Sequence, residues 1–544
     1  MATPLPYEPL LRAIGHAAAA LGLDAYAVGG AVRDALLGRE TTDLDVVAVG
    51  PGAGLALAEA AAGALGVRAP AVYPRFGTAA LRVPAGHAAG DAERDLEVEF
   101  VGARKESYRA ESRKPIVEDG TLADDLARRD FTVNALAASL APDRFGDIVD
   151  PFGGLDDLRA LVLRTPLDPG ATFSDDPLRM LRAARFAAQL EFTVDAAALD
   201  AIAEHAERIA IVSAERIADE LHKLLAADVP SRGLLVLHRT GLLDHVLPEL
   251  ARLGGVETVR GDAHKDVLLH TFDVVDNLAH IQRGRGSDIS ERAAGIDLWV
   301  RWAALLHDLA KPDTKRYEPG RGWTFHGHED RAPREHIPAL FRRLRLPLGE
   351  PLTRVQTLVR LHHRPTALVD ADVTDSAVRR LLHDAGDDLE DLMELVRADV
   401  TSKNARRARR YLAGFDRVER RMDEVEASDS LRNFEPPVSG EEIMEALGLG
   451  EGVAVGILKT WVREAILDGE VPNEHDAAWA YVLDRKDEAL RRGALFDRAV
   501  RTLRGPERRA IGAVKEALFW DDVPSGEAAH AWLDGVRDRA LADG

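Results

Sequence analysis

The chain has 544 residues, of which 46% are hydrophobic and 30% charged, and its formal net charge at pH 7 is −21. This length predicts roughly three or four domains, each able to bury its own core. The absence of cysteine excludes disulfides, thiolate metal sites and cysteine nucleophiles, and it agrees with a reducing cytoplasm. No uncharged apolar run approaches the ~18 residues of a membrane helix, and residues 1–23 lack a secretory layout. The acidic charge argues against a protein that coats nucleic acid indiscriminately. We therefore expect a cytoplasmic protein of several domains with no membrane partner.

Residues 1–150 mix strand and helix signals and predict an α/β head. Gly29 and Gly30 follow a short apolar run and open a helical pattern, so we expect a strand-to-helix turn that can approach a phosphate closely. Asp43 and Asp45 head the next apolar run. Residues two apart in a strand share a face, which predicts two convergent carboxylates suited to a pair of Mg²⁺ ions. For short motifs such as these, an ordinary turn and a solvated strand start are the alternative.

The rest of the head predicts further parts of a nucleotide site. Strands are expected near 77–83 and 95–101, and in the second of these Glu97 and Glu99 share a face, so either can supply a third carboxylate. Residues 104–119 are polar and without clear periodicity, which predicts a mobile loop. In the following R-R-D string the arginines can neutralise phosphate and the aspartate can accept a hydrogen bond from a ribose hydroxyl; a helix-start charge cluster is the alternative.

A helix is expected from Phe173 to Phe186, with Ser174 or Asp175 as its cap. Asp176 and Arg179, three residues apart, would share one face of it. An aspartate acceptor beside an arginine donor complements cytosine and adenine, which both present a ring-nitrogen acceptor next to an amino donor, and it leaves unpaired groups against uracil and guanine. An ordinary ion pair within the helix is the alternative.

Three long strings carry a resemblance to a known family: V-G-G-A-V-R-D-A-L-L-G-R-E-T-T-D-L-D from Val28, R-R-D-F-T-V-N-A-L from Arg128, and S-D-D-P-L-R-M-L-R-A-A-R-F from Ser174. They resemble class II tRNA nucleotidyltransferases and poly(A) polymerases of the DNA polymerase beta superfamily. The resemblance implies that Asp43 and Asp45 hold catalytic Mg²⁺, with Glu99 as the favoured third carboxylate. It also implies a loop at 104–119 that helps the enzyme change from adding C to adding A. The nucleotide-binding residues implied are Gly29, Gly30, Arg33, Arg128, Arg129, Asp130, Asn134, Asp175, Asp176 and Arg179. Arg182 and Arg185 extend this arginine line, and we expect them to meet the triphosphate or the tRNA end.

A second constellation of histidines and aspartates lies between about residues 256 and 403. Imidazole and carboxylate ligands spread over several helices suit a divalent or transition metal that activates water for phosphoester hydrolysis. The spread of these residues resembles the HD phosphohydrolase domain. The resemblance implies one metal held by His270, His307, Asp308 and Asp399, and His328 and His362 are candidates for a second one.

We predict an α/β (α+β) head followed by all-α domains in an elongated chain. The expected domains are a nucleotidyltransferase head at 1–154, a helical neck and body with the nucleotide-template helix at 155–255, an HD domain at 256–404 and a tRNA-binding helical tail at 405–544. The expected function is addition of C, C and A to tRNA from CTP and ATP, with an additional metal-dependent phosphohydrolase activity. A poly(A) polymerase, a partial CC- or A-adding enzyme, and an HD phosphohydrolase with a tRNA-binding head are the alternatives. The sequence leaves open the HD metal, the oligomeric state and the role of residues 480–544.

Overall fold

The computed structural model describes residues 5–41, 43–73, 77–87, 95–109, 112–259, 262–263, 266–284, 296–370, 374–401, 404–429, 434–503, 508, 510–521, 523–524 and 528–542. These residues form two compact units, 1–360 and 361–544, and each is described by itself. The division falls inside the segment predicted as the HD domain, and the predicted domain boundaries stay predictions. Within the described residues, no helix combines the length and the apolar character that crossing a membrane requires.

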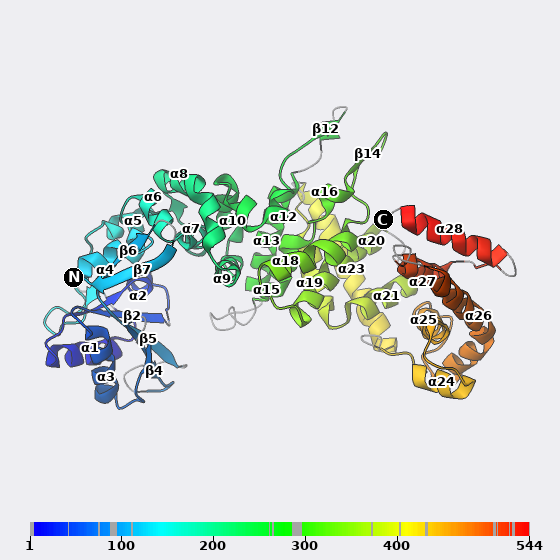
Figure 1. The fold of residues 1–544 in the computed structure, drawn as a ribbon, viewed down its shortest axis with the longest axis horizontal. Helices are drawn as coiled ribbons and strands as arrows, with labels where there is room; N and C mark the ends of the chain where they lie inside the picture. Colours follow the sequence, from blue (N-terminus) through cyan, green and yellow to red (C-terminus); the bar gives the residue numbers. More distant parts are fainter. Residues whose placement is uncertain are drawn as a thin grey trace. The chain divides into compact units, whose positions relative to one another are not determined.

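The head is built on a seven-stranded sheet with the order β3-β4-β5-β2-β1-β8-β9. Figure 1 labels β4, β5 and β2 of this sheet. Strands β2 and β5 run parallel, and the other neighbours are antiparallel. The parallel register sets Asp45 opposite Glu99. The strands are β1 Ala25–Val28, β2 Asp43–Ala48, β3 Ala71–Tyr73, β4 Thr78–Val83, β5 Leu96–Gly102, β8 Ala137–Ser139 and β9 Ile148–Val149.

The two faces of the sheet have different roles because side chains alternate along each strand. Leu44 and Val46 of β2 point into the main head core, which they share with α1 (Glu8–Ala20) and α3 (Ala53–Leu65). Val47 points the other way and packs in a smaller core with Val28 and Leu126. The predicted alternation of β2 is thus confirmed, and its aspartates lie on the face opposite the main core.

Residues 104–119 form an antiparallel pair, β6 Arg104–Arg109 and β7 Ser112–Asp119, so the expectation of a loop without regular structure was wrong. Backbone pairing between neighbouring segments satisfies their N–H and C=O groups whether or not the side chains alternate in polarity. Each strand of a two-stranded ribbon has one unpaired edge, and a proline such as Pro115 of β7 is tolerated there. The tip residues 110–111 lie outside the described residues.

The head continues through α4 (Leu122–Ala127), which a capping box of Thr121 and Asp124 begins, and a 3-10 helix, η1 (Thr132–Asn134). The following region is mainly helical, as expected, apart from the short parallel pair β10 Val162–Leu163 and β11 Thr193–Val194. Its helices are α5 Gly154–Ala160, α6 Pro169–Asp175, α7 Leu178–Leu190, α8 Ala196–His205, η2 Ala206–Ile211, α9 Ala214–Leu225, α10 Pro230–Arg239, α11 Leu242–Val246 and α12 Pro248–Ala251.

The last part of the first unit contains three of the predicted HD histidines, His270, His307 and His328. Two short hairpins, β12–β13 (Thr258–Val259, Asp262–Ala263) and β14–β15 (Arg316–Glu318, Gly322–Thr324), interrupt the helices. The helices are α13 Val267–Arg283, α15 Leu298–Leu306, α16 Lys311–Thr314, α17 His328–Arg331, the π-helix η3 Ala332–His336, α18 Ile337–Arg343 and α19 Glu350–Leu361.

A fully buried arginine joins these helices to the neck. Arg301 of α15 is 0% exposed, and its guanidinium donates to Gln282 of α13 at 2.8 Å and to the backbone carbonyls of Leu225, the last residue of α9, and of Ala227 just beyond it. Burial lowers the pKa of Arg301 to about 10, which leaves it charged at neutral pH. The side chain therefore ends α9 and fixes it against α13 and α15.

The second unit consists of α20 Arg364–Asp370, α21 Asp375–Ala385, the 3-10 helix η4 Gly386–Asp388, α22 Leu389–Ala398, α23 Ala405–Asp429, α24 Gly440–Leu447, α25 Val453–Leu467, α26 His475–Thr502, α27 Ile511–Trp520 and α28 Ala528–Ala542. The helices α24, α25 and the first half of α26 enclose one apolar core, and the end of α26 with α27 and α28 encloses another.

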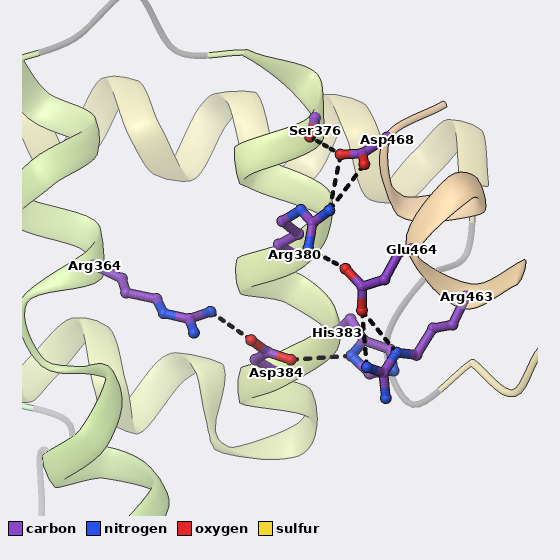
Figure 2. Close-up of polar contacts among 8 residues, drawn as sticks. All are labelled: Arg364, Ser376, Arg380, His383, Asp384, Arg463, Glu464 and Asp468. Atoms are coloured by element: carbon purple, nitrogen blue, oxygen red, sulfur yellow. Dashed lines mark hydrogen bonds and ion pairs between the residues drawn. The ribbon is translucent and has the colours of Figure 1, made fainter. Parts of the chain in front are cut away.

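An ionic network connects α21 to the C-terminal end of α25 (Figure 2). The guanidinium of Arg380 donates to both carboxylate oxygens of Asp468, at 3.0 and 2.9 Å, and also pairs with Glu464. Ser376 donates to Asp468 at 2.6 Å. Because one arginine serves two acids and one acid serves two donors, this network restrains the angle between α21 and α25 better than isolated surface pairs would.

We expect Arg301→Met to lower the free energy of unfolding by about 3 kcal/mol, since three buried acceptors lose their donor at roughly 1 kcal/mol or more each. Urea unfolding of the full chain measures this. Arg283→Met is the matched control, because Arg283 pairs with Asp228 at 3.6 Å and that carboxylate is 57% exposed. Equal effects of the two substitutions would contradict the anchoring role of Arg301.

Candidate active site

A cavity of about 670 Å³ opens on the face of the head sheet that carries the aspartates, and α7 and α9 contribute to its walls. Every residue that the sequence analysis assigned to catalysis or nucleotide binding lines it, except Asp175. The predicted lining residues are Gly29, Gly30, Arg33, Asp43, Asp45, Glu99, Arg128, Arg129, Asp130, Asn134, Asp176, Arg179, Arg182 and Arg185.

Three carboxylates meet at the sheet side of this cavity. Asp43 and Asp45 project from the same face of β2, and the parallel register brings Glu99 beside Asp45. Burial raises the pKa of the Asp45 carboxyl, Arg129 opposes that rise and Asp43 adds to it. Burial and the charge of Asp45 likewise raise the pKa of Glu99. A divalent cation would relieve this crowding of negative charge, and a donor set of carboxylate oxygens fits Mg²⁺.

The glycine turn lies directly against these carboxylates. Gly29 has φ 72° and ψ −130°, a conformation that L side chains rarely adopt, and its N–H donates to the carbonyl of Leu136 at 3.1 Å. A Cβ on Gly29 would stand 2.6 Å from Nη1 of Arg129 and 3.6 Å from Oδ2 of Asp45. The positive φ therefore favours glycine at this position, and an added Cβ would also push the Arg129 guanidinium aside.

The arginines of the R-R-D string are oriented by a buried acid. Asp125 of α4 is 0% exposed; its Oδ1 accepts from Arg128 Nη2 at 2.6 Å and its Oδ2 from Arg129 Nη2 at 3.2 Å. The sequence analysis did not identify Asp125 as a functional residue. Its spacing of three and four residues before the arginines is the signal that could have found it.

Asp130 connects the head to the neck. Its Oδ1 accepts from the backbone N–H of Phe131 at 2.8 Å and from Asn134 at 2.9 Å, and its Oδ2 accepts from Arg182 of α7 at 2.6 Å. Burial would raise the pKa of this carboxyl, but Arg182 and Asn134 outweigh it and hold the pKa well below its usual range. The amide oxygen of Asn134 in turn accepts from Arg33 at 2.6 Å. Asp130 is therefore a carboxylate that organises its neighbours, and its expected ribose contact stays a prediction.

The predicted template segment has a different local structure from the one expected. Ser174 and Asp175 are the last residues of α6 and do not cap the next helix; Asp176 is extended, and α7 begins at Leu178 after Pro177. The reason is Pro177, which disfavours a helical conformation in the residue before it. Asp176 still supports the start of α7, because its carboxylate accepts from the N–H of Leu178 at 3.3 Å.

Asp176 and Arg179 consequently have separate partners. Asp176 forms an ion pair at 3.7 Å with Arg216 of α9. The guanidinium of Arg179 donates to two backbone carbonyls, that of Thr172 at 3.3 Å and that of Arg128. The alternative interpretation, an ion pair between Asp176 and Arg179 inside one helix, is not found among the interactions of the described residues. Both side chains line the cavity.

A second cluster gathers around Asp308, which is 0% exposed. The Nε2 atoms of His307 and His328 lie 3.2 and 3.4 Å from its carboxylate oxygens, that of His270 lies at 3.7 Å, and Lys311 Nζ lies at 2.6 Å. Burial opposes ionisation, but His307 and Lys311 hold the pKa of Asp308 well below its usual range. His270, His307 and Asp308 offer ligand atoms that all lie within 4.8 Å of one another.

Backbone contacts orient two of these imidazoles. The Nδ1 atoms of His307 and His328 face the carbonyls of Ala304 and Phe325 at 2.8 and 2.6 Å. Such a contact assigns the proton to Nδ1 and leaves Nε2 as the lone-pair donor, which is the usual arrangement of metal-binding histidines. The donor set therefore fits a transition or similar divalent metal. Asp399 and His362 belong to the second unit, and their roles as ligands stay predictions.

Comparison with known proteins agrees with this arrangement. Residues 25–164 match the family described as Poly A polymerase head domain, 191–253 the probable RNA and SrmB-binding site of polymerase A, and 267–390 the HD domain. An A-adding tRNA nucleotidyltransferase of Deinococcus radiodurans is 35% identical over 463 residues, which are 83% of this chain and 93% of that protein. The chain belongs to the tRNA nucleotidyltransferase and poly(A) polymerase family.

Other members of the family support the assignment and the fold. A multifunctional CCA protein of Burkholderia pseudomallei is 37% identical over 334 residues, 59% of this chain and 71% of that protein. The solved structure of a Bacillus stearothermophilus CCA-adding enzyme in complex with CTP aligns with a TM-score of 0.57 and 25% identity, covering 88% of this chain and 96% of that one. The predicted family and fold class are thus confirmed, and the two kinds of domain imply dependence on divalent metal ions.

Sequence reasoning missed several residues that line the cavity of this nucleotidyltransferase. Arg216 was not assigned to the site, yet it reaches the lining and pairs with Asp176. Phe186, Gln189 and Lys223 were given no role, although all three line the cavity. Gln189 and Lys223 lie on α7 and α9, whose packing brings residues more than 30 positions apart to one wall, and no local pattern reports such a contact.

We expect Gly29→Ala to lower kcat/KM for nucleotide about tenfold or more, because backbone strain of about 1–3 kcal/mol and the displaced Arg129 both act inside the site. Steady-state kinetics with each nucleotide measure this. Gly38→Ala is the matched control, since Gly38 has a similar φ of 66° and no atom within 4 Å of its added Cβ. Equal losses in both variants would mean that strain alone, without the close approach to Arg129, explains the effect.

Proposed function

We propose that this enzyme adds C, C and A to the 3′ end of tRNA from CTP and ATP without a nucleic-acid template. The observation that carries the proposal is that three carboxylates, several basic side chains and the Asp176–Arg179 segment all line one cavity. Relatives named for CCA addition and for A addition support the same class of reaction.

In the proposed reaction the tRNA 3′-hydroxyl attacks the α-phosphate of the nucleotide, a new phosphodiester bond forms, and pyrophosphate leaves. Asp43 and Asp45, supported by Glu99, would hold Mg²⁺, which when bound favours the ionised hydroxyl and neutralises the phosphates. The arginines hold the triphosphate in line with the incoming hydroxyl. Asp125 and Asp130 fix these arginines before substrate binds, so less ordering remains for the moment of reaction.

Base choice is assigned to Asp176 and Arg179. An aspartate acceptor can meet the amino group that cytosine and adenine share, and an arginine donor can meet the adjacent ring nitrogen. Uracil and guanine present the reverse order, so they would leave these groups unpaired. Arg216 pairs with Asp176, and backbone carbonyls hold Arg179. The side chains of Asp176 and Arg179 are therefore positioned independently of each other.

A partial enzyme that adds only the terminal A is the second candidate. It is favoured by the Deinococcus radiodurans relative, which is named A-adding and aligns over 93% of its length. The segment 104–119, which the family resemblance connects with the change from C to A, argues against an enzyme that adds only C.

The decisive measurement uses tRNA ending before, after one and after two C residues, with Mg²⁺ and each nucleotide singly and together, followed by sequencing of the products. We expect stepwise C, C and A and then arrest. Addition of A alone would establish the partial enzyme, and long A tails would establish a poly(A) polymerase.

Asp45→Asn should reduce addition about 1000-fold, since loss of a metal ligand removes several kcal/mol of transition-state stabilisation.

We further propose that the cluster of histidines around Asp308 binds a metal ion and hydrolyses phosphoesters. Support comes from a carboxylate and three imidazoles on one buried site, with Lys311 beside them as a cation for an anionic substrate. Bound metal would lower the pKa of a water molecule that attacks phosphorus. Its identity is left to experiment. Asp399 keeps its proposed place as a further ligand of this metal, and His328 and His362 keep theirs as ligands of a second one.

The double variant His307→Ala, Asp308→Ala should lose metal-dependent hydrolysis of phosphomonoesters or cyclic phosphodiesters by about 100-fold or more and keep nucleotide addition within about twofold, because the ligands lie outside the nucleotide cavity. Both activities are measured on the same preparation, with Asp45→Asn as the reciprocal control. Hydrolysis that survives the double variant would overturn the assignment.

The domain scheme completes the proposal. We retain the head at 1–154, the neck and body at 155–255, the HD domain at 256–404 and the tail at 405–544, with the tail as a tRNA-binding part. A cytoplasmic location is proposed because the chain lacks cysteine and because its substrates would be tRNA, CTP and ATP.

A further inference from the structure

Phe186 lies in α7, and its contacts differ from those of a residue that only fills the core. Its side chain is buried, with the residue 5% exposed, and it also lines the nucleotide cavity. It packs edge-to-face against Phe131 of the head, with ring centroids 5.9 Å apart and planes at 89°. The ring is therefore held in one orientation at the point where head and neck meet.

Three arginines of the cavity gather on this one ring. Their guanidinium carbons lie 4.2 Å (Arg185), 5.2 Å (Arg33) and 5.4 Å (Arg182) from its centroid. Arg33 comes from α2 (Gly30–Leu36) of the head, and the other two come from α7. All three line the cavity, so one ring contacts arginines that come from two different parts of the chain.

Each of these guanidinium groups is also held from a second side by an oxygen acceptor. Arg33 bonds to Asn134 at 2.6 Å and Asp34 at 2.8 Å, Arg182 to Asp130 at 2.6 Å, and Arg185 to Glu220 at 3.3 Å. The acceptors fix one edge of each guanidinium group, and the Phe186 ring limits how far the guanidinium plane can rotate. Like charges this close repel, and burial together with the charge of Arg182 lowers the pKa of Arg185 to about 10. The negative face of an aromatic ring offsets part of that repulsion, which an aliphatic side chain cannot do.

We propose that Phe186 is a positioning residue for nucleotide binding: its ring sets Arg33, Arg182 and Arg185 in the array that receives the triphosphate. This rests on the proposed function, in which the cavity binds CTP and ATP. An array that is fixed before the polyanion arrives binds it without first ordering three long side chains. The ring does not touch the reacting atoms, so its effect is expected in nucleotide affinity and not in the chemical step.

The test replaces the ring and measures KM and kcat for CTP and ATP, together with the Kd of CTP in the presence of Mg²⁺ and the absence of tRNA. Phe186→Leu should raise KM and Kd roughly tenfold, the scale of a buried cation–π contact, and change kcat by no more than about twofold. Phe186→Tyr, which keeps the aromatic face, should restore most of the affinity. Phe192→Leu is the matched control, because Phe192 is equally buried, at 4% exposed, lies six residues further along and does not line the cavity.

A second variant separates the charge distribution of the ring from its shape. Incorporation of 3,4,5-trifluorophenylalanine at position 186 keeps the ring nearly unchanged in size but withdraws charge from its face. We expect a KM between those of the wild type and Phe186→Leu, with the melting temperature unchanged. This variant decides the question if Phe186→Leu fails to fold.

The outcomes distinguish this proposal from the one on which it rests. An unchanged KM in Phe186→Leu, or the same rise in Phe192→Leu, or no effect of fluorination, would reduce Phe186 to a core residue while nucleotide addition by the wild type stands. A wild type that binds neither CTP nor ATP would overturn the proposed function and this role with it.

Discussion

The carboxylate of Asp130 accepts hydrogen bonds from two parts of the chain at once. On the head side it accepts from Phe131 and Asn134, and on the neck side from Arg182. A buried carboxylate that lost one of these donors would keep its charge without compensation, which is expensive in a medium of low dielectric constant. The cavity exists only while head and neck stay in this relation, because its carboxylates belong to the sheet and much of its basic wall belongs to α7 and α9.

This compensation also explains how an acidic protein can receive a polyanion. The chain carries a net charge of −21, yet eight basic residues line the cavity: Arg33, Arg128, Arg129, Arg179, Arg182, Arg185, Arg216 and Lys223. Acids such as Asp125, Asp130 and Glu220 pair with these side chains and fix them without neutralising the wall as a whole. Basic residues are therefore concentrated at the site, while the net charge of the whole chain disfavours indiscriminate binding of nucleic acid.

Local periodicity predicted those parts of the site that depend on one strand or one turn. The alternation along β2 identified Asp43 and Asp45, and the same rule made Glu99 one of two candidates on β5. It failed where the structure depends on backbone pairing, on a neighbouring proline or on a partner distant in sequence. The hairpin at 104–119 depends on pairing between its own strands, and Asp176 leaves the helix because of the proline that follows it. Phe186 looked like any apolar residue on a helix; only the meeting of head and neck brings Arg33 to its ring.

The two candidate metal sites differ in chemistry as well as in place. In the head the ligands offered are carboxylate oxygens, hard donors that suit Mg²⁺ bound together with phosphates. Around Asp308 they are mostly imidazole nitrogens, held by backbone carbonyls so that Nε2 faces the carboxylate. Nitrogen donors favour transition metals over Mg²⁺, so the two donor sets would suit different ions. In the proposed function, one chain joins nucleotides with the first site and hydrolyses phosphoesters with the second, and neither reaction has to share its metal with the other.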